Sequence, residues 1–461
     1  MTIAQERPSP TGPRRVPPGP PRRAMLSLLR RLNSDRLGLM RAAADEFGDA
    51  ARIVVGPKVL YFFNHPDHAK HVLTDNSANY HKGFGLAQAK RALGDGLLTS
   101  EGELWRKQRK IIQPVFQNKR IAQQAGVIAE EAAGLVARLR TRAGTGTPVD
   151  VLEELNTLTL GVLGRTLLDS DLGAFEGIGR SFEAVQDQAM FEAVTLSKVP
   201  TWVPLPKQLR FRRARRDLQS IVDTLVADRR ARGDDVTGDD VLSRLIVSVE
   251  QEADPRVGRQ RMLDELVTLL LAGHETTAST IGWTLHLVNE HPEVGERLHE
   301  EAVRVLGDRP PAYEDLRGLR YTAMVLEEVM RLYPPVWMLS RLGQQDDVIG
   351  GYHVPAGCDV LICPYTLHRH KEFWTDPERF DPERFDPDVQ HGRPRYAYIP
   401  FGAGPRFCVG NHLGMMEATF VIAMLARELR LTTVPGYRVV PEPMLSLRVR
   451  GGLPMTVTAA R

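Results

Sequence analysis

The order of apolar and polar residues between positions 100 and 330 is helical for most of its length. Apolar side chains recur three and four residues apart over 121–142, 152–168, 212–232 and 240–250, as on the buried face of an amphipathic helix. A longer run over 259–291 predicts a helix of roughly 50 Å, at about 1.5 Å per residue, which is long enough to cross a domain. Another helix is predicted over 412–428.

Two stretches have the alternation and turn residues of strands. Residues 51–55 and 59–63 flank the turn Gly56-Pro57-Lys58 and predict a hairpin, and residues 343–364 become strand-like between glycine turns. Seven prolines within residues 1–24 exclude a helix there and predict a disordered, then extended, lead-in. No comparable linker follows, so residues 25–461 are expected to form one mainly α domain with a small β subdomain.

Composition places the chain among ordinary globular proteins, with 42% hydrophobic and 25% charged residues. The net charge of +3 argues against a protein dedicated to nucleic acid. The apolar run at 266–273 has eight residues, where a membrane span needs about 20. Three cysteines, Cys358, Cys363 and Cys408, do not make a disulfide framework and fit a reducing, cytoplasmic location.

The segment 401–410 reads Phe-Gly-Ala-Gly-Pro-Arg-Phe-Cys-Val-Gly and precedes a predicted helix. Its three glycines leave little side-chain bulk, so the loop can press against a flat cofactor and aim the Cys408 sulfur at it. Backbone N–H groups at the start of the helix can stabilise a thiolate. A lone cysteine would be interpreted as a small buried apolar residue, but this pattern favours a ligand.

The spacing Phe-x-x-Gly-x-Arg-x-Cys-x-Gly resembles the heme-binding loop of cytochrome P-450 enzymes. The resemblance implies that Cys408 is the axial thiolate ligand of heme b and that Arg406 contacts a heme propionate. It also places Phe401, Gly402 and Gly410 in the cofactor loop. Thiolate ligation pushes electron density onto iron and favours O–O cleavage.

A second motif, Ala272-Gly273-His274-Glu275-Thr276-Thr277, lies inside the long predicted helix. Threonine hydroxyls can compete for backbone carbonyls, so a widened turn with room for a small ligand is expected here. The motif is similar to the family's Ala-Gly-x-Glu/Asp-Thr-Thr. The resemblance implies that Glu275 and Thr276 form an acid–alcohol pair that supplies protons, beside Ala272 in the substrate pocket. A zinc-binding His-Glu-x-x-His is excluded, because Ala278 occupies the second histidine position.

Glu328 and Arg331 are three residues apart and can pair on one helix face. Alone, that pair predicts a solvated surface contact. The resemblance implies instead a buried structural network that includes Arg384 of the Pro-Glu-Arg-Phe motif. Arg379, in the preceding copy of the same pentapeptide, is the less favoured third member.

Trp105 and Arg109 lie four residues apart on a predicted helix over 104–113, so an indole N–H and a guanidinium can donate to one anion. The resemblance implies that this anion is a heme propionate and that Arg341 contacts a propionate as well. On residue types alone, an ordinary helix surface would be the better interpretation.

The segment Val336-Trp337-Met338 carries no charge. The resemblance places it in the substrate pocket beside the heme, so an apolar substrate is expected, such as a terpenoid, a fatty acid or a polyketide-like molecule of secondary metabolism. The implied reaction is insertion of one oxygen atom from O2.

Electrons are expected from a separate ferredoxin and ferredoxin reductase, because the 461 residues contain no flavin or Fe–S cysteine pattern. Arg106, Lys107 and Lys110 are expected to face outward and attract an acidic ferredoxin. Two alternatives stay open: a peroxide-driven oxygenase or oxidative coupling enzyme on the same fold, and a heme sensor without turnover. The sensor is less favoured because it would not need Glu275 and Thr276.

Overall fold

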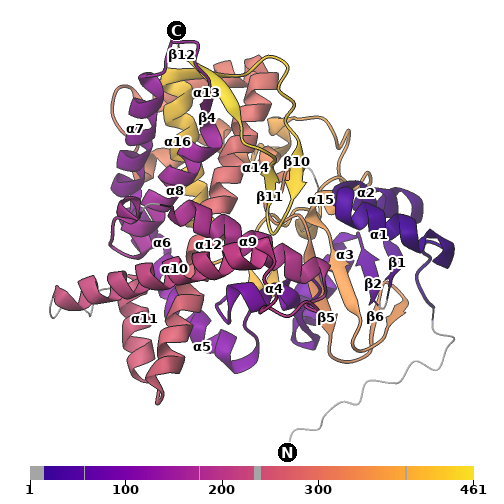
Figure 1. Cartoon of the computed structure of the whole chain (residues 1–461). Helices are drawn as coiled ribbons and strands as arrows, with labels where there is room; N and C mark the ends of the chain where they lie inside the picture. Colours follow the sequence, from indigo (N-terminus) through magenta and orange to yellow (C-terminus); the bar gives the residue numbers. More distant parts are fainter. Residues whose placement is uncertain (1–14, 57, 176, 233–239, 390–391, 461) are drawn as a thin grey trace, which may run out of the picture.

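Helices make up most of the protein, and the largest sheet lies at one side (Figure 1). The computed structural model describes residues 15–56, 58–175, 177–232, 240–389 and 392–460. This arrangement confirms the expected mainly α fold with a small β part. The helices are α1 Met25–Ser34, α2 Arg36–Phe47, α3 Pro66–Lys70, α4 Leu86–Leu93, α5 Gly102–Ile112, α6 Asn118–Gln123, α7 Ala125–Arg140, α8 Val151–Leu167, α9 Ile178–Val194, α10 Pro206–Ala231, α11 Val241–Glu250, α12 Pro255–Glu290, α13 Pro292–Leu306, α14 Arg320–Leu332, α15 Pro364–Leu367 and α16 Asn411–Glu428.

Most predicted helices occur within a few residues of their expected bounds, including the long one, α12, which has 36 residues. The helix predicted over 121–142 is wrong in one respect. The chain forms two helices there, α6 and α7, which meet at Gln124. Backbone hydrogen bonds of the turn type, such as Gln124 N–H to Ile121 O at 2.9 Å, replace a continuous helical ladder at that point.

The largest sheet has the strand order β1-β2-β8-β5-β3. Its β1–β2 hairpin confirms the prediction, with Ala50 opposite Phe63 and Val55 opposite Lys58. Strand β2 then pairs in parallel with β8, which brings the start of the chain beside residues near 360. The strands are β1 Ala50–Val55, β2 Lys58–Phe63, β3 Tyr80–Lys82, β4 Val149–Asp150, β5 Leu339–Gly343, β6 Asp347–Ile349, β7 Tyr352–Val354, β8 Asp359–Ile362, β9 Leu429–Thr433, β10 Pro441–Pro443, β11 Leu447–Val449 and β12 Pro454–Ala459.

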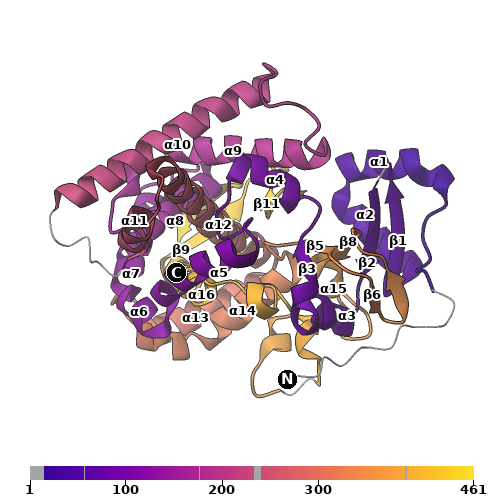
Figure 2. The ribbon, with the colours of Figure 1, turned by 90° about the horizontal axis from the view of Figure 1, so that it is seen from below.

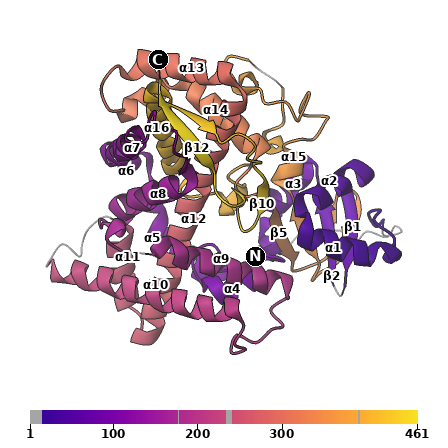
Figure 3. The same cartoon turned by 45° about the horizontal axis from the view of Figure 1, so that its top comes forward.

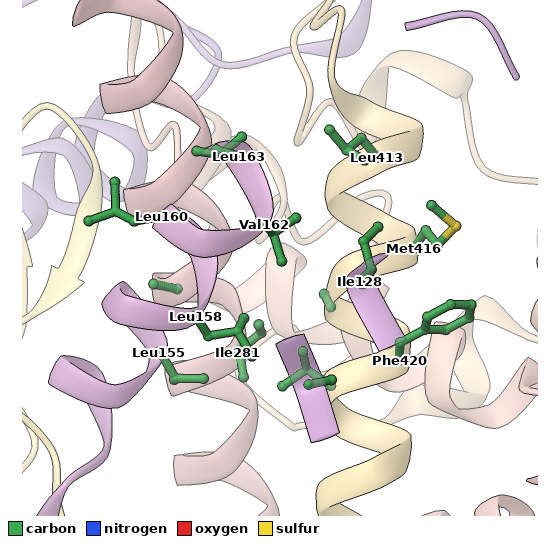
Figure 4. Close-up of a cluster of buried hydrophobic side chains, with 14 of the residues drawn as sticks. Ile128, Leu155, Leu158, Leu160, Val162, Leu163, Ile281, Leu413, Met416 and Phe420 are labelled. Atoms are coloured by element: carbon green, nitrogen blue, oxygen red, sulfur yellow. The ribbon is translucent and has the colours of Figure 1, made fainter. Parts of the chain in front are cut away.

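The main hydrophobic core surrounds α12, with α7, α8 and α16 packed nearby. Figure 4 shows part of it, where leucines of α8 such as Leu158 approach Ile281 of α12, with Phe420 of α16 close by. Trp283 of α12 also stacks on Tyr333 with ring centroids 4.0 Å apart. The central helix is therefore held on several sides, which gives any functional group on it a fixed position.

The predicted proline-rich lead-in falls partly outside the described residues, which begin at Arg15. Residues 15–21 have no regular secondary structure and lie against the sheets, with Arg52 N–H donating to Pro18 O at 2.7 Å and His353 N–H to Arg15 O at 2.8 Å. Among the described helices, none is both long and apolar enough to cross a membrane.

Candidate functional site

A cavity of about 530 Å³ connects Cys408 with the surface. Its inner wall includes α12 and the start of α16, and its outer wall includes α1 and the end of α9. Leu29 of α1 and Val194 of α9 line the cavity while 41% and 49% exposed, so the cavity opens between these two helices. Most of the other lining side chains are hydrocarbon, which suits an apolar ligand.

Cys408 lies on the loop before α16, and its residue is solvent-accessible where it faces the cavity. Burial in the surrounding protein raises the pKa of the thiol. The backbone N–H groups of Gly410 and Asn411 and the charge of Arg109 act in the opposite direction and favour the thiolate. The structure thus aims one of the chain's three cysteine thiols into the cavity and gives it donors suited to a negative charge.

Glycines shape this loop in two different ways. Gly402 and Gly404 have φ of +71° and +67°, a conformation that side chains with a Cβ rarely adopt. A Cβ at Gly404 would also lie 1.9 Å from the carbonyl oxygen of Leu73, in the π-helical turn His71–Asp75. Gly410 and Phe401, which the resemblance implied for the cofactor loop, line the cavity together with Cys408.

Arg406 and Trp105 meet at one side of the cavity. The Arg406 guanidinium lies 4.0 Å from the centroid of the Trp105 ring and donates to Ser100 O at 2.9 Å. It also pairs with Glu101. Arg109, one turn after Trp105 on α5, lines the same cavity and donates to Phe407 O at 2.8 Å. The structure therefore brings together the three residues that the two distant motifs contributed.

Two more cations complete this group, and one of them was not found from the sequence. Arg341 of β5 lies directly opposite Lys82 of β3 in an antiparallel pair, and both line the cavity. Burial lowers the pKa of Arg341 to about 10, and burial with the nearby Arg341 and Arg406 charges holds the pKa of Lys82 well below its usual range. Like charges opposite each other destabilise a sheet, so this pair indicates a site for an anion.

The residues present fit a heme. A flat macrocycle with two carboxylates needs an apolar slot, an axial donor and cations at one edge. The cavity supplies hydrocarbon walls, the Cys408 sulfur and a group of four cations, Lys82, Arg109, Arg341 and Arg406. Among the described contacts of Arg406, Glu101 is the only carboxylate that pairs with it. Burying a surplus of positive charge is costly without an anionic ligand.

The α12 motif reaches the same cavity. Ala272 is exposed although it lies on the central helix, because it faces the cavity, and Thr276 lines the cavity one turn later. The expected widened turn is wrong: residues 255–290 form a continuous α-helix. The Thr276 hydroxyl donates to Ala272 O at 2.6 Å, and this bond is made without opening the helix.

Glu275 points away from solvent and has a near-neutral pKa. Burial raises the pKa of its carboxyl to about 7, against the charge of Arg448 and donation from Ser446 and Gln186, which lower it. The Gln186 side-chain amide, on α9, donates to one carboxyl oxygen. A carboxyl that changes protonation near neutral pH beside a hydroxyl-bearing residue can hold and pass on a proton.

Glu417 of α16 is a second buried acid, and the sequence interpretation overlooked it. Its side chain lines the cavity, and one carboxyl oxygen has no hydrogen-bond partner among the described residues. Burial alone holds the pKa of Glu417 well above its usual range, which favours the protonated, uncharged carboxyl. Only its spacing of nine residues from Cys408 could have drawn attention to it.

Val336, Trp337 and Met338, which the resemblance implied for the substrate pocket, line the cavity. Trp337 is held in place because its indole N–H donates to Met444 O at 2.9 Å. That bond satisfies the polar atom of the ring and leaves an apolar surface toward the cavity.

Glu328, Arg331 and Arg384 form a separate buried group, and none of the three lines the cavity. Arg331 makes two charge-assisted bonds to Glu328, at 2.6 and 2.7 Å, and Arg384 lies 3.4 Å from the same carboxylate. Arg379 offers Arg331 only its backbone carbonyl, at 3.0 Å. The side chain that the resemblance favoured is therefore the one that joins the network.

The outer face of α5 differs from the expectation of three outward, available cations. Lys107 pairs with Glu252 at 3.0 Å, and Arg106 pairs with Glu103 on its own helix. Lys110 is exposed. The local positive charge is therefore smaller than the sequence suggested.

The chain matches the family model described as "Cytochrome P450" over residues 17–454. Cyclooctatin synthase of Streptomyces melanosporofaciens is 35% identical over 409 residues, which cover 88% of each chain. Cyclooctat-9-en-7-ol 5-monooxygenase of the same organism is 35% identical, over 86% of this chain and 85% of that protein. Pentalenene oxygenase of Streptomyces avermitilis is 31% identical, over 89% and 90%.

The match extends over nearly the whole chain and includes the cysteine loop, the α12 motif and the buried glutamate–arginine network described above. Oxygen-dependent oxidation of an apolar substrate at a heme-thiolate centre is the chemistry of this family. The chain belongs to the cytochrome P450 family of heme-thiolate monooxygenases.

Proposed function

We propose that this enzyme binds heme b and inserts one oxygen atom from O2 into a terpenoid carbon skeleton. One observation supports this most directly: a single apolar cavity joins Cys408, the α12 residues Glu275 and Thr276, and an opening at the surface. An apolar molecule entering between α1 and α9 therefore meets mostly hydrocarbon walls on its way to the sulfur-facing chamber, with Arg36 of α2 beside Leu32 at the entrance.

The side chains have distinct roles in this proposal. Cys408 supplies the axial thiolate, and Lys82, Arg109, Arg341 and Arg406 neutralise the two carboxylates of the cofactor. Bound heme supplies reductive activation of O2 and transfer of one oxygen atom to carbon. Trp105 orients Arg406 through the ring contact described above.

Proton supply falls to α12. Glu275, protonated below a pKa of about 7, holds a proton in the buried helix wall. The Thr276 hydroxyl faces the cavity and can accept a hydrogen bond while it donates to Ala272 O. Thr276→Ala is expected to leave heme bound but to divert electrons from product to hydrogen peroxide, because the relay to the reacting oxygen is lost.

Two features support a terpenoid substrate. The cavity walls near Val336, Trp337 and Met338 are hydrocarbon. Three of the relatives carry names that refer to cyclooctatin, cyclooctat-9-en-7-ol or pentalenene. A role in secondary metabolism follows from this substrate class.

We also propose that residues 25–461 act as one cytoplasmic domain that receives electrons from a ferredoxin and its reductase. Lys110 is exposed on α5, and its neighbour Arg109 donates to Phe407 O in the Cys408 loop. An exposed positive charge at this place supports the approach of an acidic ferredoxin on this side of the enzyme.

The test uses purified heme-loaded enzyme. Cyclic sesquiterpene and diterpene hydrocarbons are titrated for a low-to-high-spin shift, and turnover is run in ¹⁸O2 with NADPH, ferredoxin and reductase. One labelled oxygen atom per product molecule is expected. Turnover with peroxide alone would instead indicate the peroxide-driven alternative, and a spin shift without any turnover would indicate a sensor.

Cysteine variants provide the matched control. Cys408→Ser should abolish the carbon monoxide difference band from which the family takes its name, because a hydroxyl does not replace the thiolate. Cys358→Ser should keep it, since Cys358 is not among the residues that line the cavity. A Cys408→Ser protein with an unchanged band would show that the axial ligand lies elsewhere.

A further inference from the structure

One cation clamps the turn that follows α9. Arg91 of α4 donates from Nη1 to Glu192 at 2.9 Å, to Ser197 O at 2.5 Å and to Val199 O at 3.4 Å. Glu192 is 1% exposed in its side chain and also accepts from Gln188 at 2.8 Å. A charge-assisted group of this kind holds its partners more firmly than neutral hydrogen bonds.

The clamped turn has an unfavourable backbone. Leu196 and Ser197 have φ of +54° and +55°. Two successive residues with a Cβ in the left-handed region are rare, and such conformations persist only where the surroundings hold them. Because Arg91 binds the carbonyl of Ser197 and that of Val199, it is the side chain best placed to hold this turn.

The same turn forms one edge of the cavity opening. Val194 and Leu196 line the cavity, together with Leu29 and Leu32 of α1. Helices α4 and α9 pack closely against each other, and Figures 2 and 3 show them side by side, with the end of α9 directed toward α1 and α2. A shift of the turn would therefore move two apolar side chains at the opening.

We propose that Arg91 is a specificity-determining residue, which fixes Val194 and Leu196 at the opening and thereby limits the size of the apolar molecules that reach Cys408. The proposal shares one assumption with the proposed function, namely that apolar ligands reach Cys408 through this cavity. Arg91 contacts neither the cavity nor the cysteine loop in the described structure, so its effect is on access.

The experiment compares Arg91→Met and Arg91→Lys with a matched control, Arg165→Met, all as heme-loaded protein. Arg165 is 36% exposed in its side chain, against 34% for Arg91, and pairs with Glu130 and Glu131 away from the opening. Hydrogen exchange of residues 192–199 should rise about tenfold in Arg91→Met and remain at the wild-type rate in Arg165→Met.

Access is measured with two iron-binding azoles of different size, imidazole and clotrimazole, by stopped-flow absorbance. Arg91→Met should raise the association rate of clotrimazole roughly tenfold and change that of imidazole less than about twofold, with Arg91→Lys between it and wild type. The lysine variant keeps the charge, so it tests the proposal even if the methionine variant does not fold.

Two results would overturn the proposal: a folded Arg91 variant with unchanged exchange and an unchanged ratio of azole rates, or an equal change in Arg165→Met. Failure of the proposed function gives a different result, in which wild-type enzyme oxidises no terpene while the azole ratio still responds to Arg91.

Discussion

Around Glu328, two arginines and the backbone N–H of Asp381 share one buried carboxylate, and the remaining N–H groups of Arg331 reach backbone carbonyls. In the second group, Arg406 and three other cations line a cavity, and one carboxylate, that of Glu101, pairs with Arg406. Both groups bury charge. The first is complete within the chain, whereas the second is balanced only when an anion enters. Charge of the first kind serves folding, and charge of the second kind serves binding.

The largest effect is expected from breaking the complete group. Glu328→Ala leaves Arg331 buried without its carboxylate, which should cost about 3–5 kcal/mol of unfolding free energy. Chemical denaturation with heme content as a second readout measures it. The control is Glu383→Ala, which removes an exposed pair with Arg297 and should cost at most about 1 kcal/mol. An equal loss of unfolding free energy in the two variants would contradict the proposed difference between the buried network and an exposed ion pair.

Arg406 and Arg384 separate binding from folding. Arg406→Leu should weaken heme binding by about 1.5–3 kcal/mol, roughly ten- to hundredfold, because a charge-assisted bond to a propionate is lost. Arg384→Leu should lower the midpoint of denaturation and leave heme dissociation from the folded protein unchanged. Heme transfer to apomyoglobin measures the rate of heme dissociation. Faster heme dissociation in Arg384→Leu than in Arg406→Leu would contradict the assignment of Arg384 to folding and of Arg406 to binding.

The pH dependence of coupling, which is the amount of product formed per NADPH consumed, tests the role of Glu275 on α12. Burial sets the pKa of Glu275 at about 7, so the carboxyl is mostly protonated at pH 6 and mostly ionised at pH 8. Product formed per NADPH should therefore fall up to about tenfold over this range, because a donor must carry its proton. Glu275→Gln should lower coupling throughout and remove the slope. A wild-type profile that rises with pH would contradict this role.

Lys82→Met should have opposite effects on the stability of the heme-free protein and on its affinity for heme. Burial and the like charges of Arg341 and Arg406 lower the pKa of Lys82, so replacing it with methionine should stabilise the heme-free fold and weaken heme binding. Because the folded pKa lies below the unfolded one, heme-free stability should rise with pH as Lys82 loses its proton. Thermal denaturation of the heme-free variant should lack that rise.

The smallest effect is expected at α5. Reversing Lys107 and Lys110 to glutamate should slow ferredoxin-driven reduction a few-fold at low ionic strength only. The pairing of Lys107 with Glu252 reduces the charge available to a partner. Substrate-induced spin shifts serve as the control and should not change. Identical reduction rates at low salt would place the docking surface elsewhere.

The sequence predicted those parts of the site that are contiguous in the chain. Cys408 with Arg406, and Glu275 with Thr276, are each defined by neighbours within one loop or helix turn. Lys82 could not be found in this way, because only the pairing of β3 with β5 places it opposite Arg341. Glu417 is indistinguishable in sequence from a surface residue of an amphipathic helix until the packing of α16 buries it.

The fold shows the same division. Periodicity predicted α8, α10, α11, α12 and α16, because their apolar faces are long. It joined α6 to α7, since the break at Gln124 interrupts the backbone but not the apolar spacing. The widened turn in α12 was wrong because the Thr276 hydroxyl bonds to Ala272 O within regular helix geometry.

Gly404 lies against Leu73, and that contact has a mechanical consequence. The loop that carries Cys408 is braced by a turn from the first fifth of the chain, at a spacing that leaves no room for even one methyl group. The turn His71–Asp75, which packs in one buried cluster with Phe63 and Ile362 of the largest sheet, therefore supports the loop that holds the sulfur ligand. A shortened protein that kept every helix from α4 onward but lost all residues up to Asp75 would have an unsupported cysteine loop, and the position of the sulfur would shift.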